Sequence, residues 1–129
     1  MNTIQEARRY LDEARDILRE KANKEDGYYL NTKYVKMAGH TAYAGVLVAL
    51  DGFLGKKGKG RKDVDWYKQQ LAPFDKKLRN AFVGAYYTLN LSMSYDGNPS
   101  VSIAEAGLAE AENVINWVES WMAEELKIS

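Results

Sequence analysis

The chain has 129 residues, of which 46% are apolar and 28% charged, so it is long enough for one globular domain and has the composition of a folded protein. It contains no cysteine and a single histidine, which excludes disulfides, thiol nucleophiles and zinc sites built from thiolates or paired histidines. Its 18 basic and 18 acidic residues cancel, so the whole chain lacks the excess positive charge of a dedicated nucleic-acid binder. We predict one domain over residues 1–129, with no metal and no other cofactor.

The beginning of the chain resembles neither a signal peptide nor a membrane anchor. Charged residues recur every few positions from Glu6 onward, which leaves no apolar core for a secretion signal. The longest apolar run covers the nine residues 42–50, whereas a membrane-spanning helix needs about 20. These features predict a cytoplasmic protein of bacterial type that does not contact a membrane.

The first half of the chain predicts two helices. A helix that ends around Lys24 follows from apolar residues at intervals of three and four, which form one stripe: Ile4, Ala7, Leu11, Ala14 and Leu18. A second helix, from about Leu30 to Leu54, is apolar around most of its circumference and rich in alanine and glycine. Such a helix is buried on several sides and allows close approach of its neighbours, so we expect it at the centre of the fold.

The second half predicts three more helices and no β-strand. After a glycine- and lysine-rich loop over residues 55–62, a short helix covers Asp63 to about Leu71. Pro73 is expected in the first turn of a longer helix that ends near Tyr95, before the turn sequence 96–99. Ser102 and Glu105 predict a capping box at the start of the last helix. The fold class is therefore all-α, an antiparallel bundle of four long helices and one short helix.

Charge is distributed unevenly along the chain. Residues 56–79 contain nine basic and three acidic residues, a net charge of +6, while residues 102–129 contain six glutamates and one lysine, a net charge of −5. Contacts with an RNA or DNA backbone are one hypothesis for the basic loop, and a solvated loop that aids solubility is the simpler alternative. The candidate nucleic-acid-binding residues are Lys56, Lys57, Lys59, Arg61 and Lys62.

Two further residue types have both a structural and a functional interpretation. The nine tyrosines and three tryptophans could stack on unpaired bases, but Trp117 and Trp121, one helical turn apart, favour a core or a subunit interface. His40, the only histidine, has no second histidine and no nucleophile motif beside it. We interpret it as a packing or surface residue.

Residues 79–86, with the sequence RNAFVGAY, carry the most specific pattern in the chain. They resemble the signature of the HEPN superfamily, which comprises small helical bundles that include RNA-cleaving toxins, often encoded beside nucleotidyltransferases. In that signature an arginine and a polar residue are followed, four to six positions after the arginine, by a histidine and often by a tyrosine. Arg79, Asn80 and Tyr86 match the pattern, while Gly84 stands where the histidine belongs.

The replacement by glycine bears directly on chemistry. RNA cleavage through the 2′-hydroxyl needs a group that exchanges a proton near neutral pH, and histidine is suited to this role. Arg79 alone supplies phosphate binding, and Gly84 supplies no proton transfer. His40 is the candidate substitute in the chain, and the structural alternative for Arg79 is an ion pair with Asp75 one turn earlier.

Two hypotheses of different class follow. The leading one is a non-catalytic HEPN-like module of an uncharacterised bacterial family, which binds another molecule. The resemblance implies a homodimer, and the acidic last helix suggests a contact with the basic region 56–79 of a second copy. The alternative is a HEPN-type ribonuclease or toxin component that works with a nucleotidyltransferase and uses Arg79, Asn80, Tyr86 and His40, or a protein that only binds RNA.

Overall fold

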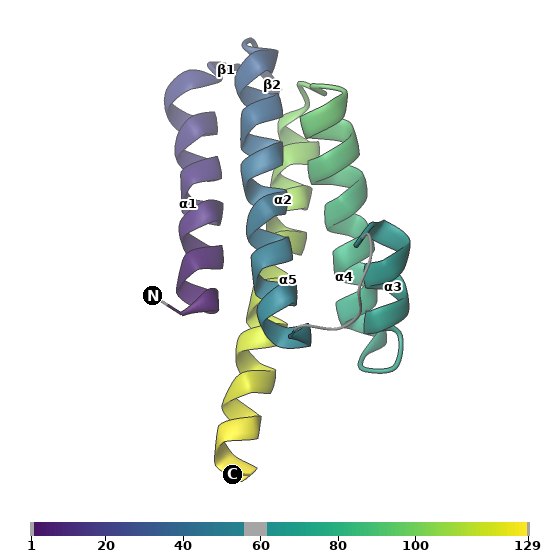
Figure 1. Ribbon diagram of the computed structural model, residues 1–129. Helices are drawn as coiled ribbons and strands as arrows, with labels where there is room; N and C mark the ends of the chain where they lie inside the picture. The colour runs from purple at the N-terminus through teal and green to yellow at the C-terminus, as the bar shows by residue number, and fades with distance from the viewer. Residues whose placement is uncertain (1, 56–61, 129) are drawn as a thin grey trace.

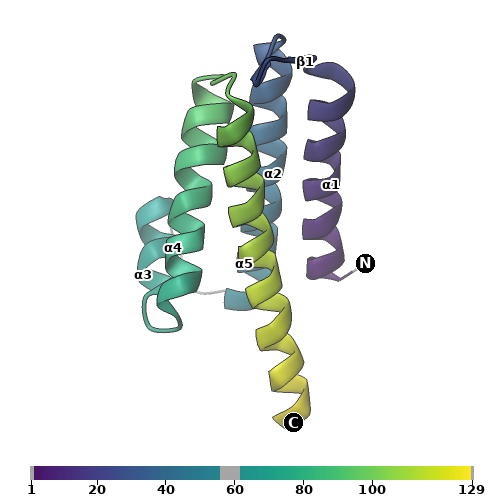
Figure 2. The same ribbon diagram turned by 180° about the vertical axis from the view of Figure 1, so that it is seen from behind.

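A computed structural model describes residues 2–55 and 62–128, with side chains to residue 126, and its architecture is a bundle of antiparallel helices (Figures 1 and 2). The prediction of the all-α class is confirmed. The helices of the described residues are α1 (Thr3–Lys21), α2 (Thr32–Leu54), α3 (Val64–Leu71), α4 (Lys76–Ala85), its continuation η1 (Tyr86–Tyr95), and α5 (Val101–Ile128). The short helix α3 packs on the outside of α4, and the C-terminal part of α5 extends beyond the end of the bundle.

Helix α1 forms as its apolar stripe predicts, and all five stripe residues are buried. It begins with a capping box in which Asn2 accepts a hydrogen bond from the amide of Gln5 at 2.8 Å and Gln5 accepts one from the amide of Asn2 at 3.2 Å. It ends at Lys21 rather than at Lys24, because the chain then turns into a hairpin.

That hairpin corrects the prediction of a chain without strands. Two short antiparallel strands, β1 (Lys24–Glu25) and β2 (Tyr28–Tyr29), are joined by Asp26 and Gly27. The φ angles of these two residues are 51° and 81°, as the tight turn of a two-residue hairpin requires. The hairpin closes one end of the bundle.

Helix α2 is the central helix, as predicted from its composition. It packs against α1, η1 and α5, and nine of its residues are buried. By length and composition alone α2 is apolar enough to cross a membrane. Because α2 packs against three neighbouring helices, its position in the core of the bundle explains its apolar composition.

Segment η1 is a π-helix, a type that the sequence did not predict, although the predicted end at Tyr95 is correct. The wider turns of a π-helix shift each backbone hydrogen bond by one residue, as in the 2.9 Å bond from the amide of Asp96 to the carbonyl of Leu91. At the junction with α4, the hydroxyl of Thr88 donates to the carbonyl of Gly84 at 2.7 Å. This side-chain bond satisfies a carbonyl at the point where the hydrogen-bond pattern changes.

Two helix starts differ from the sequence predictions. Pro73 lies in the turn before α4, and Asp75 is the N-cap, accepting hydrogen bonds from the amides of Lys77 at 2.7 Å and Leu78 at 3.1 Å. Helix α5 begins at Val101, so Ser102 lies inside its first turn and forms no capping box with Glu105. Caps depend on which residue leaves the helical conformation, which the spacing of polar residues alone does not define.

The acidic helix α5 is partly neutralised within its own chain. Arg8 of α1 pairs with Glu119 at 3.0 Å, and Arg15 of α1 pairs with Glu112 at 3.0 Å. A contact between α5 and the basic region of a second copy therefore has two fewer glutamates available than the sequence suggests.

The two tryptophans of α5 take part in an aromatic cluster near the end of α2. Phe53 contacts the ring of Trp117 edge-to-face with 5.2 Å between centroids, and that of Trp121 with 4.8 Å. Phe74, in the turn before α4, contacts Phe53 at 4.8 Å. The cluster joins three segments of the chain, which agrees with the core interpretation of these tryptophans.

Candidate functional site

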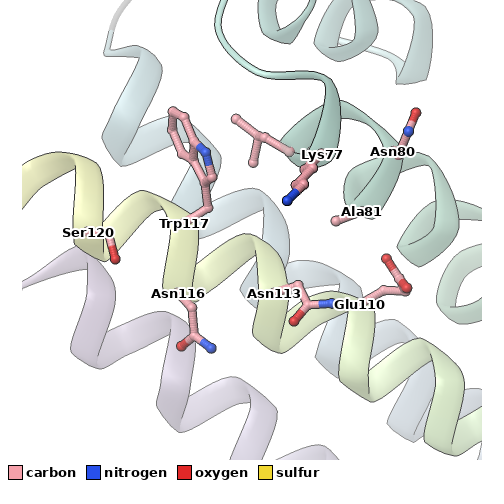
Figure 3. Close-up of a pocket in the computed structure, with 9 residues that line it drawn as sticks. Lys77, Asn80, Ala81, Glu110, Asn113, Asn116, Trp117 and Ser120 are labelled. Carbon is pink, nitrogen blue, oxygen red and sulfur yellow. The ribbon is translucent and has the colours of Figure 1, made fainter.

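A groove between α4 and α5 has a volume of about 580 Å³ (Figure 3). That volume lies within the range of small-molecule sites. Its floor is apolar and its walls are polar. The floor consists of Leu78, Ala81 and Trp117, and the walls of Lys77, Asn80, Glu110, Asn113, Asn116 and Ser120.

Glu110 of α5 lines the groove, and Gly84 of α4 lies beside it. A Cβ atom placed on Gly84 would lie 3.2 Å from the Cγ, Cδ and Oε2 atoms of Glu110. The carboxylate of α5 therefore lies against the position at which the HEPN pattern has an imidazole. Only glycine leaves the Glu110 side chain in this place without displacement, because the distance is shorter than an ordinary van der Waals contact.

The structure distributes the three matching motif residues over two sides of α4. Asn80 lines the groove, and Arg79 is exposed and lines no part of it. Among the described residues Arg79 has no ion-pair partner, and Asp75 caps the helix instead of pairing with it. This corrects the expected ion pair.

Tyr86 lies on the side of the helix toward α2 and α3, away from the groove. Its ring contacts that of Tyr43 with 6.1 Å between centroids and that of Tyr87 with 5.5 Å. It lines a separate depression of about 230 Å³ together with residues of α3. The motif is thus contiguous in sequence but does not converge on one cleft.

His40 is exposed on α2 and is distant from Arg79 along the bundle. Its neighbour Gly39 lies against the backbone of Leu89, which follows Arg79 by ten residues. Ten helical residues span roughly 12 to 15 Å. The structure therefore does not bring the imidazole of His40 to the guanidinium of Arg79.

Of the five basic residues proposed to bind nucleic acid, Lys62 is within the described part of the chain. Lys56, Lys57, Lys59 and Arg61 lie outside the described residues. Lys62 forms an ion pair with Asp51 at 3.1 Å, and its ammonium lies 5.6 Å from the ring centroid of Trp66. The same oxygen of Asp51 accepts a 2.7 Å hydrogen bond from the hydroxyl of Tyr67.

The Tyr67–Asp51 hydrogen bond predicts a pH dependence. Burial, and then the bond to Asp51, raise the pKa of Tyr67 well above its ordinary value of 10.0. The unfolded chain therefore loses this proton first, and the free energy of unfolding decreases as the pH rises above 10. Urea titrations between pH 8 and about 11 should show a smaller decrease for Tyr67→Phe, with a loss of about 1 kcal/mol at neutral pH. Tyr95→Phe, at an exposed tyrosine, is the control, and an equal pH slope in all three proteins would contradict the prediction.

The α5 side of the groove was not predicted from the sequence. Glu110, Asn113, Asn116 and Ser120 recur at intervals of three, three and four, which places them on one helical face. That spacing is a signal for a polar face on the last helix, whereas the net charge of residues 102–129 does not show which face is polar. Among the described residues, no three His, Asp or Glu side chains are close enough together to hold a metal ion.

These features define the chain as a small helical-bundle protein with a polar groove between two antiparallel helices. It belongs to the family described as Domain of unknown function (DUF5618), which matches residues 2–120. A solved structure described as a protein of unknown function from Dyadobacter fermentans is 58% identical and superposes with a TM-score of 0.89, covering 92% of this chain and 94% of that chain. No curated protein matches the chain. The relationship to HEPN proteins remains a prediction.

Proposed function

We propose that the protein is a non-catalytic HEPN-like binding module and that its α4–α5 groove is the binding surface. The observation that carries this proposal is the carboxylate of Glu110 against Gly84. A carboxylate at this position repels the phosphate that a HEPN nuclease must hold, and it occupies the place of the imidazole that would exchange the proton.

The positions of the other motif residues support the same conclusion. Arg79 is outside the groove, Tyr86 packs against Tyr43, and His40 is more than two helical turns from Arg79 along the bundle. Acid–base catalysis needs its groups within hydrogen-bond reach of one reacting bond. No such arrangement exists among Arg79, Tyr86 and His40.

The proposal includes a homodimer in a bacterial cytoplasm. Exposed apolar side chains on two adjacent elements support a contact between copies: Met37 of α2, 42% exposed, and Tyr87 and Tyr95 of η1, 56% and 79% exposed. Exposed apolar side chains that form one contiguous patch frequently mark an interface between proteins. A nucleotidyltransferase-type protein is the heterologous partner that the HEPN resemblance implies.

A cleavage assay tests the non-catalytic proposal. We expect purified protein to leave both structured and single-stranded RNA intact, with no difference between the native chain and Arg79→Ala. The Arg79→Ala variant should retain its fold, because Arg79 is exposed and unpaired among the described residues. Cleavage by the native protein that disappears in Arg79→Ala would establish the ribonuclease instead.

RNA binding without cleavage is the second candidate function, favoured by the excess of basic residues over 56–79. Contacts with phosphates release counterions, so their affinity decreases steeply as salt is added. Lys62→Gln would weaken such binding only slightly, because this lysine is already paired with Asp51. Titration of RNA at two salt concentrations distinguishes the candidates: a salt-independent or undetectable affinity argues against RNA as the ligand.

A further inference from the structure

The α4–α5 groove carries opposite charges toward its two ends. Glu110 lies beside Gly84, whereas Lys77 precedes Gly84 by seven residues on α4, which corresponds to about 10 Å along the helix axis. The two helices are antiparallel, and side chains lean toward the N-terminus of their own helix. Lys77 and Glu110 therefore lie at different positions along the groove, with Glu110 at one end of the lining residues (Figure 3).

Polar groups without protein partners lie around this pair of charges. Within the described part of the chain, the side chains of Lys77, Asn80, Glu110 and Asn113 make no hydrogen bond or ion pair. Asp75 is near enough to Lys77 for the ammonium to contribute to its lowered pKa, but its main partners are backbone amides of α4, Leu78 first. The ammonium of Lys77 is thus available to a ligand.

The groups between the two charges match peptide bonds. A side-chain amide offers one acceptor and two donors, which is the combination that pairs with a backbone carbonyl and amide. Asn80 on α4 and Asn113 on α5 carry such amides, and both residues line the groove. The apolar floor formed by Leu78, Ala81 and Trp117 offers contact surface for small side chains.

We propose that the groove binds a short peptide of about three residues with free termini, with its ammonium group near Glu110 and its carboxylate near Lys77. This inference rests on the proposed binding function and names its ligand. Three extended residues span about 10 Å, which is comparable to the axial distance between Lys77 and Gly84, the residue beside Glu110. A free amino acid is too short to reach both, and a polyanion is repelled by Glu110.

The peptide trialanine tests the proposal directly. Titration into ¹⁵N-labelled protein, followed by NMR, is expected to give saturable shifts at Asn80 and Asn113, and the N-acetylated, C-amidated peptide is expected to bind at least about tenfold more weakly. Absence of shifts at these residues up to about 10 mM trialanine would overturn the proposal, since any weaker binding is not specific recognition. Equal affinity for the capped peptide would overturn it as well.

Two variants test the roles of the two charges, and each has a matched control. Lys77→Gln and Glu110→Gln are expected to reduce the affinity for trialanine about fivefold each, the effect of losing one partly exposed charge pair. Lys76→Gln on α4 and Glu105→Gln on α5 neutralise exposed residues outside the groove and should leave the affinity unchanged. Equal losses in groove and control variants would refute the assigned geometry. The RNA-cleavage assay is independent of these results. The peptide proposal can therefore be refuted while the non-catalytic proposal stands, and RNA cleavage can be found while peptide binding is confirmed.

Discussion

Gly39→Ala is expected to lower the free energy of unfolding by about 2 to 3 kcal/mol, because α2 and η1 touch at this glycine. A Cβ atom at this position would lie 2.6 Å from the carbonyl oxygen of Leu89, 2.6 Å from the Cβ of Met93 and 2.8 Å from the amide nitrogen of Ser94. Two of these three atoms belong to the backbone, which cannot rotate away as a side chain does. Relief requires the π-helix and α2 to separate, with loss of the packing around Met93.

Gly84→Ala is the matched control, since it makes the same chemical change in another helix. The gain in helix propensity is the same, about 1 kcal/mol. Here the new Cβ meets only the flexible side chain of Glu110 at 3.2 Å, which can move toward solvent. The stability should therefore stay the same or rise by as much as about 1 kcal/mol. Urea unfolding of both variants measures the difference, and equal midpoints would show that η1 does not approach α2 this closely.

The spacing of apolar residues predicts where helices lie, and it therefore sets how much of this fold the sequence could predict. The stripe of α1 and the small, apolar composition of α2 predicted two helices and the central position of α2, and both are confirmed. The π-helix could not be predicted, because a shift of the hydrogen bonds by one residue hardly changes apolar spacing over ten residues. Asp-Gly is a known signal for a two-residue hairpin turn, but the strands beside Asp26 and Gly27 have two residues each and are too short to show alternation of apolar and polar side chains.

The candidate site was only half predictable. Asn80 and Gly84 were identified from the motif, and the consequence of the missing imidazole was derived from chemistry alone. Glu110 and Asn113 were not identified, because nothing in the sequence specifies which face of the last helix lies beside α4. Asn80 and Tyr86 line different depressions, because six residues along a helix place two side chains on different faces.

Phe82→Ala is expected to produce the largest loss of stability, about 3 to 5 kcal/mol, since it leaves a cavity at the junction of three helices. Phe82 is wholly buried, and its ring lies 6.4 Å from that of Tyr43 on α2 and 5.5 Å from that of Tyr67 on α3. Tyr67 is held in place by its hydrogen bond to Asp51, so its ring cannot move to fill the space.

The neighbouring residue supplies the control for this prediction. Val83 is only half-buried, and Val83→Ala removes fewer buried atoms from the same helix while improving its helix propensity, so the expected loss is below about 1 kcal/mol. Urea unfolding at neutral pH compares the two variants. A domain of this size is stable by about 5 to 15 kcal/mol, so Phe82→Ala should remove a substantial part of that stability. A loss similar to that of Val83→Ala would mean that Phe82 does not join α2, α3 and α4, and the wall of the groove that α4 carries would then lack its support from behind.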